Sequence, residues 1–318
     1  MSIVIEKSGI LDTFQDLGRN GFRKFGVNPN GAMDKIAVRL INILLGNDEN
    51  ETVLEMHFPA PVIKFTESSI IALGGANFGA KVDEKNLENW KPLFIKKDSI
   101  LKFTEKISGN RAYLAIKGGF EIENLLESGS TNLLAEFGGF RGRSLKENDE
   151  IQFRNKNTKA NYFENKISRT LIPKYEKTPK IRITSGAEFG LLTGLSEETL
   201  LKEVFTIENN SNRMAFRMKG EPLYLLDETA MLSSAVNFGT IQLLPGGQMI
   251  ILMADHQTIG GYPRIADIFS LDLPILAQLS ANDQFGFDLI KHEEAEKALN
   301  QFEKDLQFLK IGCKFHSF

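Results

Sequence analysis

The stretch MIILMADHQTIGGYPRIA, residues 249–266, shows the pattern from which the fold of this chain is predicted, a short apolar segment followed by polar and turn residues. Six almost wholly apolar residues, 249–254, predict a buried strand, because a short apolar run bounded by turn residues is typical of one. Four polar residues follow together, and then a glycine pair with Tyr262 and Pro263. Two interpretations stay open for this stretch alone, a strand that ends in a satisfied polar turn and a strand that delivers polar side chains to the rim of a site.

Similar short segments recur along the chain and predict a mainly β fold with few helices. They are rich in Val, Ile, Phe and Thr, and examples are PVIKF, SIIALGG, RAYLAIKGG, KIRITSG and TIQLLPGG. Three helices are expected. One covers residues 34–45, with Asp34 as its cap and Gly46 at its end, one follows SGAEFG with Ser196 as its cap, and one runs from His292 to about Lys310.

A polar, basic stretch divides the chain into two predicted β subdomains. Residues 1–153 form the first, residues 154–180 a linker or excursion, and residues 181–318 the second with a C-terminal helix. Each half has a similar phrase, LKENDEIQF (145–153) and LSANDQFGF (279–287), in which Asn-Asp suits a turn and the remainder a strand. Two related β domains would explain this repeat, and coincidence is the alternative.

Composition narrows the class of protein. Hydrophobic residues make up 42% of the 318 residues and charged residues 25%, and the net charge of −3 gives no electrostatic argument for nucleic acid or an anionic membrane. The single cysteine allows neither an intrachain disulfide nor a cysteine-based zinc site, and the four histidines lack metal-ligand spacing, so no metal is expected. Without a signal peptide or an apolar run of roughly 20 residues, a cytoplasmic protein is expected.

Two polar stretches in the first half suggest an anion site. In TFQDLGRNGFRKFGV (13–27), Asp16 and Arg19 lie three apart in a glycine-rich turn, and Asp34 opens a helix whose N-terminal amides favour an anion. A substrate carboxylate or phosphate could be held by Arg19 and those amides, whereas the structural alternative makes Asp34 a cap and Asp16–Arg19 a loop contact. In residues 128–145, the glycines allow the backbone to approach a ligand, and Arg141 and Arg143 can donate bidentate hydrogen bonds to it. The alternative is a mobile basic loop.

In the second half, NNSNRMAFRMKG (209–220) places Arg213 and Arg217 four residues apart. On a strand both would lie on one face, which suggests an anionic ligand. Salt bridges to acids elsewhere are the alternative. The chain has no G-x-x-x-x-G-K-[ST] phosphate loop, so any ATP site is unusual or belongs to a partner.

Taken in order, the motifs resemble the biotin-dependent carboxyltransferase-like family. The resemblance covers about residues 3 to 295 and rests on QDLGRxGF, GAMDxxAxRLxNxLLGN, RAYLAIxGG, GST, FGGxxGRxL, NRMxxRMxG, GxIQLxPGGQxIILMADxQTxGGYPRIA and DLPxLAQL. Members of that family include the second subunit of allophanate hydrolase and urea carboxylase-type systems, the regulator KipA, and the C component of prokaryotic ATP-dependent 5-oxoprolinase.

The resemblance implies two cyclophilin-like β-barrel subdomains. It also implies a subunit of an ATP-dependent 5-oxoprolinase-type amidohydrolase, which opens 5-oxoproline to glutamate together with homologues of the KipI-like B component and of the A component. The alternatives are a non-catalytic KipA-like regulator that binds a KipI-like partner, and a carboxyltransferase subunit of an allophanate hydrolase or urea carboxylase-type system. Ala32-Met33-Asp34 has no acceptor lysine, so covalent biotin is not expected on this chain.

The predicted site combines these motifs. The catalytic candidates are Asp255, Gln257, Thr258 and Asp16, with Asp255 as the general base if its surroundings raise its pKa. The candidates for binding a small amide or carboxylate substrate are Arg19, Asp34, Ser130, Arg213, Arg217, Gln242 and Tyr262. Four positions depart from the usual family pattern: Gly129 and His256 replace arginine, Asn212 replaces aspartate, and Ser234 replaces glutamate. These losses bear on whether the family's substrate is turned over.

Overall fold

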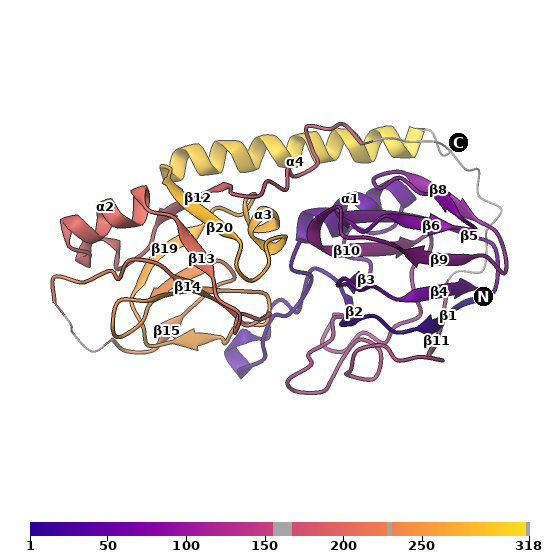
Figure 1. The fold of residues 1–318 in the computed structure, drawn as a ribbon, viewed down its shortest axis with the longest axis horizontal. Coiled ribbons are helices and arrows are strands. Elements are labelled where there is room, and N and C mark those ends of the chain that lie inside the picture. The colour runs from indigo at the N-terminus through magenta and orange to yellow at the C-terminus, as the bar shows by residue number, and fades with distance from the viewer. Residues whose placement is uncertain (155–166, 228–230, 316–318) are drawn as a thin grey trace. The chain divides into compact units, whose positions relative to one another are not determined.

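The computed structural model describes residues 1–154, 167–227 and 231–315 (Figure 1). The chain forms two compact units: unit 1 contains Met1–Arg19, Asn30–Pro173 and Phe302–Phe318, and unit 2 contains Asn20–Pro29 and Lys174–Gln301. These units differ from the predicted boundaries in two places, because residues 20–29 belong to unit 2 and residues 302–318 to unit 1. Of the predicted linker 154–180, residues 155–166 lie outside the described residues.

Unit 1 consists of two antiparallel sheets. The six-stranded sheet has the order β11-β1-β4-β9-β6-β7, and the five-stranded sheet has the order β2-β3-β10-β5-β8. The strands are β1 (Ser2–Lys7), β2 (Asp12–Gln15), β3 (Val53–Met56), β4 (Val62–Phe65), β5 (Ser69–Asn77), β6 (Ala80–Val82), β7 (Lys85–Asn86), β8 (Pro92–Ile95), β9 (Ile100–Phe103), β10 (Ser108–Ile116) and β11 (Glu150–Gln152).

The five-stranded sheet of unit 1 is buried on both faces, which explains its unbroken apolar runs. On β10, Leu114 and Ile116 join the core shared with the six-stranded sheet, while Tyr113 and Ala115 face the opposite way. That second face packs against α1 (Lys35–Leu45), whose Val38 belongs to the same cluster. Successive residues of a strand point to opposite faces, so two buried faces need hydrophobic residues at every position.

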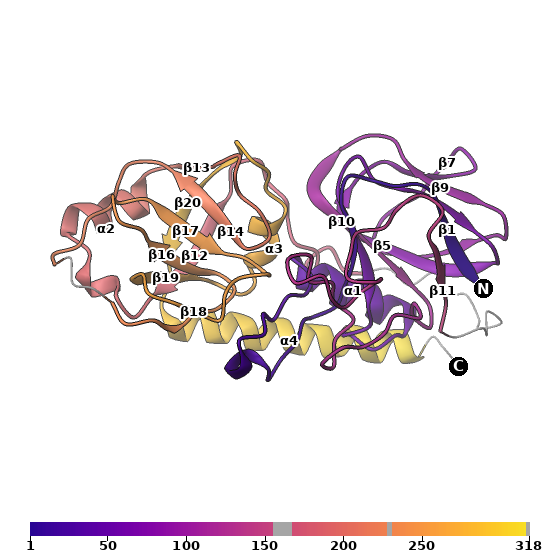
Figure 2. The ribbon, with the colours of Figure 1, turned by 90° about the horizontal axis from the view of Figure 1, so that it is seen from below.

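Unit 2 is built on a closed seven-stranded barrel of the order β12-β19-β16-β17-β14-β13-β20 (Figure 2). Its strands are β12 (Lys180–Ser185), β13 (Phe205–Ile207), β14 (Ala215–Lys219), β16 (Thr240–Leu243), β17 (Met249–Leu252), β19 (Arg264–Ile268) and β20 (Gln284–Leu289), with β15 (Ser234–Ala235) and β18 (Ile259–Gly260) as a separate pair. The helical elements are η1 (Arg23–Phe25), η2 (Phe189–Leu191), α2 (Gly194–Lys202) and α3 (Leu273–Ala277). The predicted mainly β class with few helices is confirmed.

The repeated sequence motif, residues 145–153 and 279–287, forms the same kind of turn in both units. Asn148 and Asn282 have φ of 68° and 69°, the left-handed region that asparagine tolerates. The carboxylate of the following Asp149 or Asp283 accepts a hydrogen bond of 2.7 Å from the N–H three residues earlier in each copy. The asparagine N–H donates a hydrogen bond of 2.8 Å in each copy, to a carbonyl of β1 in unit 1 and to the Ile207 carbonyl at the end of β13 in unit 2. The same local bonds at equivalent strands support two related β domains.

The helix predictions are confirmed with small shifts. Asp34 caps α1 by accepting from the Ala37 N–H, and Gly46 ends it at φ 69°. The cap of α2 is Thr193 and not Ser196, because the Thr193 hydroxyl accepts from the Ser196 N–H. The last helix, α4 (His292–Phe315), is longer than predicted. None of the helices in the described ranges is both long and apolar enough to cross a membrane.

Candidate active site

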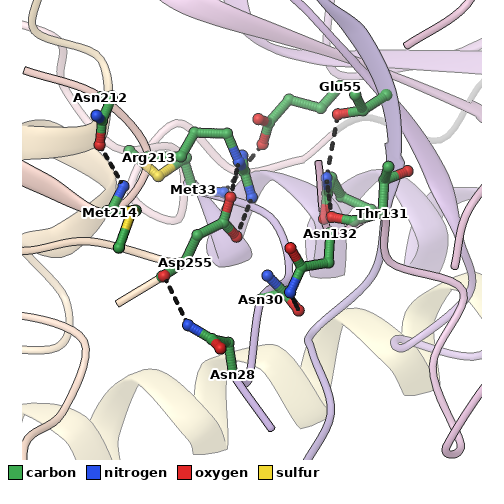
Figure 3. A network of polar contacts seen from close by, with 12 residues as sticks. Asn28, Asn30, Met33, Glu55, Thr131, Asn132, Asn212, Arg213, Met214 and Asp255 are labelled. Atoms are coloured by element: carbon green, nitrogen blue, oxygen red, sulfur yellow. Dashed lines mark hydrogen bonds and ion pairs between the residues drawn. The ribbon is translucent and has the colours of Figure 1, made fainter. Parts of the chain in front are cut away.

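The polar turn after β17 holds the charged pair of unit 2. The Asp255 carboxylate accepts two hydrogen bonds from the Arg213 guanidinium, at 2.9 Å from Nε and 3.2 Å from Nη2 (Figure 3). The two side chains are only 14% and 8% exposed, so little water screens the pair. The backbones are joined as well, since the Asp255 N–H donates to the Arg213 carbonyl at 2.8 Å. For Arg213 the structure shows the salt bridge that the sequence left as an alternative.

Arg217 has a different environment. It lies on β14, where Phe216 and Met218 are buried and Arg217 and Lys219 are exposed. Arg213 lies two residues before this strand and is buried. The structure therefore separates the two arginines that the sequence places on one strand face. A binding role for Arg217 stays a prediction.

A short relay of amides runs from the polar turn into the barrel wall. Gln257 Nε2 donates to Gln242 Oε1 at 3.5 Å, and Gln242 Nε2 donates to the Tyr262 carbonyl at 3.2 Å. Gln242 is fully buried on β16. A Cβ at position 260 would lie 2.6 Å from Gln242 Nε2, so glycine at this position allows the backbone to approach that amide.

Tyr262 also lines a cavity of about 400 Å³ in unit 2. The wall is mostly apolar and includes Leu223, Met231 and Leu243, while Gly246 contributes backbone. This volume lies in the range of small-molecule sites. Because the relay ends at the Tyr262 carbonyl, the polar turn and the cavity belong to one connected region of unit 2.

In unit 1, Asp16 organises a loop cluster. Its carboxylate accepts hydrogen bonds from the N–H groups of Gly18 and Gly129, both at 2.7 Å, and from the hydroxyls of Ser128 at 2.8 Å and Ser130 at 2.5 Å. The side chain of Asp16 is almost wholly buried. The structure thus brings together Asp16 and Ser130 from the predicted site, and both hold loop backbone in place.

Arg19 completes the same cluster. It is fully buried, its Nε donates to the Leu125 carbonyl at 3.2 Å, and its Nη1 donates to Asn30 Oδ1 at 3.1 Å. Nη2 donates to the Ser130 carbonyl, and the guanidinium lies 4.7 Å from the centre of the Phe137 ring. These contacts match the structural alternative of a loop contact, and anion binding by Arg19 stays a prediction.

Asp34 lies beside a buried tyrosine. Its Oδ1 accepts from the Ala37 N–H at 2.9 Å, and its own N–H donates to the Tyr113 hydroxyl at 2.8 Å. That hydroxyl donates to Glu55 Oε2 at 2.9 Å. Burial, and then the negative charges of Glu55 and Asp34, raise the pKa of Tyr113, which keeps it a neutral donor. Asp34 therefore caps α1, which is the structural alternative that the sequence left open beside anion binding.

Two of the family departures, Gly129 and His256, have local explanations. A Cβ at Gly129 would clash with Thr52 Oγ1, so the backbone there is closed to a larger residue while Thr52 is present. His256 is 1% exposed, and its Nδ1 lies 2.5 Å from the Gln257 carbonyl. Since a carbonyl only accepts, this Nδ1 carries the hydrogen. The imidazole at this position therefore holds the turn.

Two side chains at this site were not predicted. Asn28 donates to the carbonyls of Asp255 and His256, and Arg23 donates to the carbonyls of Val236 and Thr258 (Asn28 and Asp255 in Figure 3). Both come from residues 20–29, more than 200 positions from the turn in sequence. Only the density of polar residues in that stretch was a signal. Within the described residues no cluster of histidine, cysteine and acidic side chains has the arrangement of a metal site.

Comparison with known proteins defines the class. Residues 25–289 match the family described as carboxyltransferase domain, subdomain A and B. The chain therefore belongs to this carboxyltransferase family, and the resemblance drawn from the motifs is confirmed.

The similar proteins include 5-oxoprolinase components and urea amidolyases. The chain is 36% identical to the C component of 5-oxoprolinase from Haemophilus influenzae over 90% of both chains, and 33% identical to that of Escherichia coli over 98% of both. It is 29% identical to urea amidolyase of Saccharomyces cerevisiae but spans only 17% of that protein. The structure of Kluyveromyces lactis urea amidolyase covers 97% of this chain with a TM-score of 0.90 at 24% identity, and this chain spans 20% of it, which supports the fold alone.

Proposed function

We propose that this chain is a subunit of an ATP-dependent 5-oxoprolinase-type amidohydrolase, which opens the lactam of 5-oxoproline to glutamate. The observation that carries the proposal is the end-to-end similarity to the C component of Escherichia coli 5-oxoprolinase, 33% identity over 98% of both chains. The chain matches 98% of the length of that component but only 17% of urea amidolyase of Saccharomyces cerevisiae, which favours the function of the C component.

The proposed substrate-binding region is the polar turn of unit 2 with the adjoining cavity. A lactam presents one carbonyl acceptor and one N–H donor, and the amides of Gln242 and Gln257 can serve as complementary partners. Asp255, held by Arg213, is the proposed proton acceptor, and Thr258 and Tyr262 complete the wall. In unit 1, a supporting role in binding is proposed for the residues that keep its loop and helix in place, Asp16, Arg19, Asp34 and Ser130.

Partner subunits are part of the proposal. The names of the similar proteins describe one component of a larger 5-oxoprolinase, which implies others. We propose homologues of the KipI-like B component and of the A component as partners, one of which binds ATP, because the sequence has no phosphate loop. The proposed complex acts in the cytoplasm, where a lone cysteine such as Cys313 stays reduced.

Reconstitution tests the proposal. The chain is purified with its neighbouring-gene partners, and glutamate release that depends on 5-oxoproline and ATP is measured. We expect full activity only with all subunits, and a kcat about 10²- to 10⁴-fold lower for Asp255→Asn because the proton acceptor is removed. Asp288→Asn, an exposed carboxylate of unit 2, is the matched control and keeps the wild-type rate. Undiminished activity without this chain would refute the proposal.

One observation favours a non-catalytic alternative, a regulator that binds a KipI-like partner. Both carboxylate oxygens of Asp255 accept from Arg213, so the group that should take the proton is already engaged. In that case the complex assembles without turnover, and Asp255→Asn leaves its assembly unaffected. The reconstitution above separates the two functions.

A further inference from the structure

The turn at residues 253–258 leaves the barrel ladder, so its carbonyl groups need donors from outside the sheet. Met253 accepts from the N–H of His256 within the turn at 3.0 Å. The carbonyls of residues 255–258 each accept from a side chain. Their donors therefore decide where this backbone lies.

Asn28 supplies the first two of these bonds. Its Nδ2 donates to the Asp255 carbonyl at 3.0 Å and to the His256 carbonyl at 2.7 Å. Figure 3 shows the consequence for Asp255, whose carboxylate meets Arg213 while its carbonyl meets Asn28. Two side chains from distant parts of the sequence thus fix the two ends of this residue.

Arg23 fastens the other end of the turn. Its Nη1 donates to Asn237 Oδ1 at 2.7 Å, and its Nη2 donates to the Val236 carbonyl and, at 3.5 Å, to the Thr258 carbonyl. The Val236 N–H donates to the same Thr258 carbonyl at 3.3 Å. A planar guanidinium presents several N–H donors in a fixed arrangement, which allows it to serve these acceptors together.

The segment 20–29 is shaped to present both donors. Arg23 begins the short helix η1, and Gly26 ends it at φ 78°, a conformation that glycine adopts without strain. The chain then continues so that Asn28 reaches the turn. Arg23 and Asn28 are both half-buried, so water competes less for their acceptors than it would at an exposed position.

We propose that Arg23 and Asn28 are positioning residues, which clamp the backbone of residues 255–258 so that Asp255 and Thr258 are held in place for catalysis. The catalytic part rests on the proposed function. Neither residue needs to touch substrate, since each acts through the carbonyls of the turn. Losing the clamp lets the turn move, and small displacements of reacting groups reduce turnover more than substrate binding.

The sharpest variant is Asn28→Asp, which keeps the size of the side chain but replaces the donor with an oxygen facing two carbonyls. In the reconstituted complex we expect kcat to fall about 10- to 100-fold with little change in KM. The matched control is Asn89→Asp in unit 1. It removes a hydrogen bond of 3.1 Å from the Asn89 side-chain amide to the Ala76 carbonyl, and we expect it to leave kcat unchanged.

Arg23→Ala provides a second test through chemical rescue. Guanidinium chloride at low concentration should restore part of kcat, because the free ion can occupy the position of the lost side chain. Guanidinium weakens folded structure in general, so a variant that is merely unstable loses activity instead. Lys24→Ala, at an exposed neighbouring position, keeps its activity and shows no rescue.

Hydrogen exchange of the peptide covering 253–262 tests the clamp without relying on activity. We expect faster exchange there in Asn28→Asp and Arg23→Ala, but not in Asn89→Asp. Unchanged exchange, or wild-type kcat in both variants of an active complex, would overturn the inference. If the wild-type complex releases no glutamate, the proposed function fails, and the exchange result alone then upholds or overturns the clamp.

Discussion

The stability of unit 1 is expected to fall as pH rises through neutrality because of one buried acid, Asp12. This residue begins β2 and is fully buried. The Gly9 N–H donates to its Oδ2 at 2.6 Å, while Oδ1 has no hydrogen-bond partner among the described residues. Burial raises the pKa of Asp12 from 3.8 to about 7, and the Gly9 bond offsets only part of this rise.

The sign and size of the effect follow from proton linkage. The folded state binds the proton more tightly than the unfolded state, so the stabilisation is complete below the unfolded pKa near pH 4 and is lost as pH rises through about 7. A pKa difference of about 3 corresponds to about 4 kcal/mol, of which about 3 kcal/mol is lost between pH 5 and pH 8.5. Asp12→Asn keeps an oxygen for the Gly9 N–H and has no charge to bury, so it lacks this loss.

Urea unfolding followed by tryptophan fluorescence measures this directly, because Trp90, the single tryptophan, lies in unit 1. The free energy of unfolding of Asp12→Asn minus that of the wild type should rise by about 3 kcal/mol from pH 5 to pH 8.5. A difference that stays flat, or falls, would refute the reasoning. Asp149→Asn is the control of opposite sign: Arg143 lowers the pKa of Asp149, so that substitution costs stability at neutral pH and the cost disappears toward low pH.

Three further substitutions in unit 1 can be measured with the same fluorescence assay. The Asp16 carboxylate accepts four hydrogen bonds, and in Asp16→Asn the new NH2 group would point at groups that are themselves donors. We expect the unfolding free energy to fall by about 2–4 kcal/mol, and an unchanged urea midpoint would contradict this. Gly75 has φ 71°, and in Gly75→Ala the added Cβ would clash with the Arg111 carbonyl, so we expect a loss of about 1–3 kcal/mol of unfolding free energy. An unchanged unfolding free energy would show that the strand relaxes. Arg39 lowers the pKa of Glu303, so Glu303→Gln should cost at most about 1 kcal/mol at pH 7, since the pair is partly exposed, and nothing once pH falls through that pKa.

Local patterns predicted the parts of the fold that depend on neighbouring residues. The 3.6-residue periodicity and caps of residues 34–45 predicted α1 to within a residue, since a cap and an apolar face are encoded within one short segment. The repeated Asn-Asp phrase likewise predicted two turns that agree in φ and in their hydrogen bonds. Pairing order was not accessible, because the register of β12 with β20 depends on residues about 100 positions apart.

The site shows the same limit more sharply. The sequence indicated Asp255 and Arg213 as functional groups, yet could not show that they bind each other, because a polar group in a single sequence carries no sign of its partner. Nothing in the sequence singled out Asn28, because its two hydrogen-bond acceptors are carbonyls more than 200 residues away. Asp255 is held at its carboxylate by one distant segment and at its carbonyl by another. A substitution in residues 20–29 should therefore alter the chemistry of the turn while the motif ADHQT is unchanged, and an explanation of activity that relies on that motif alone would miss it.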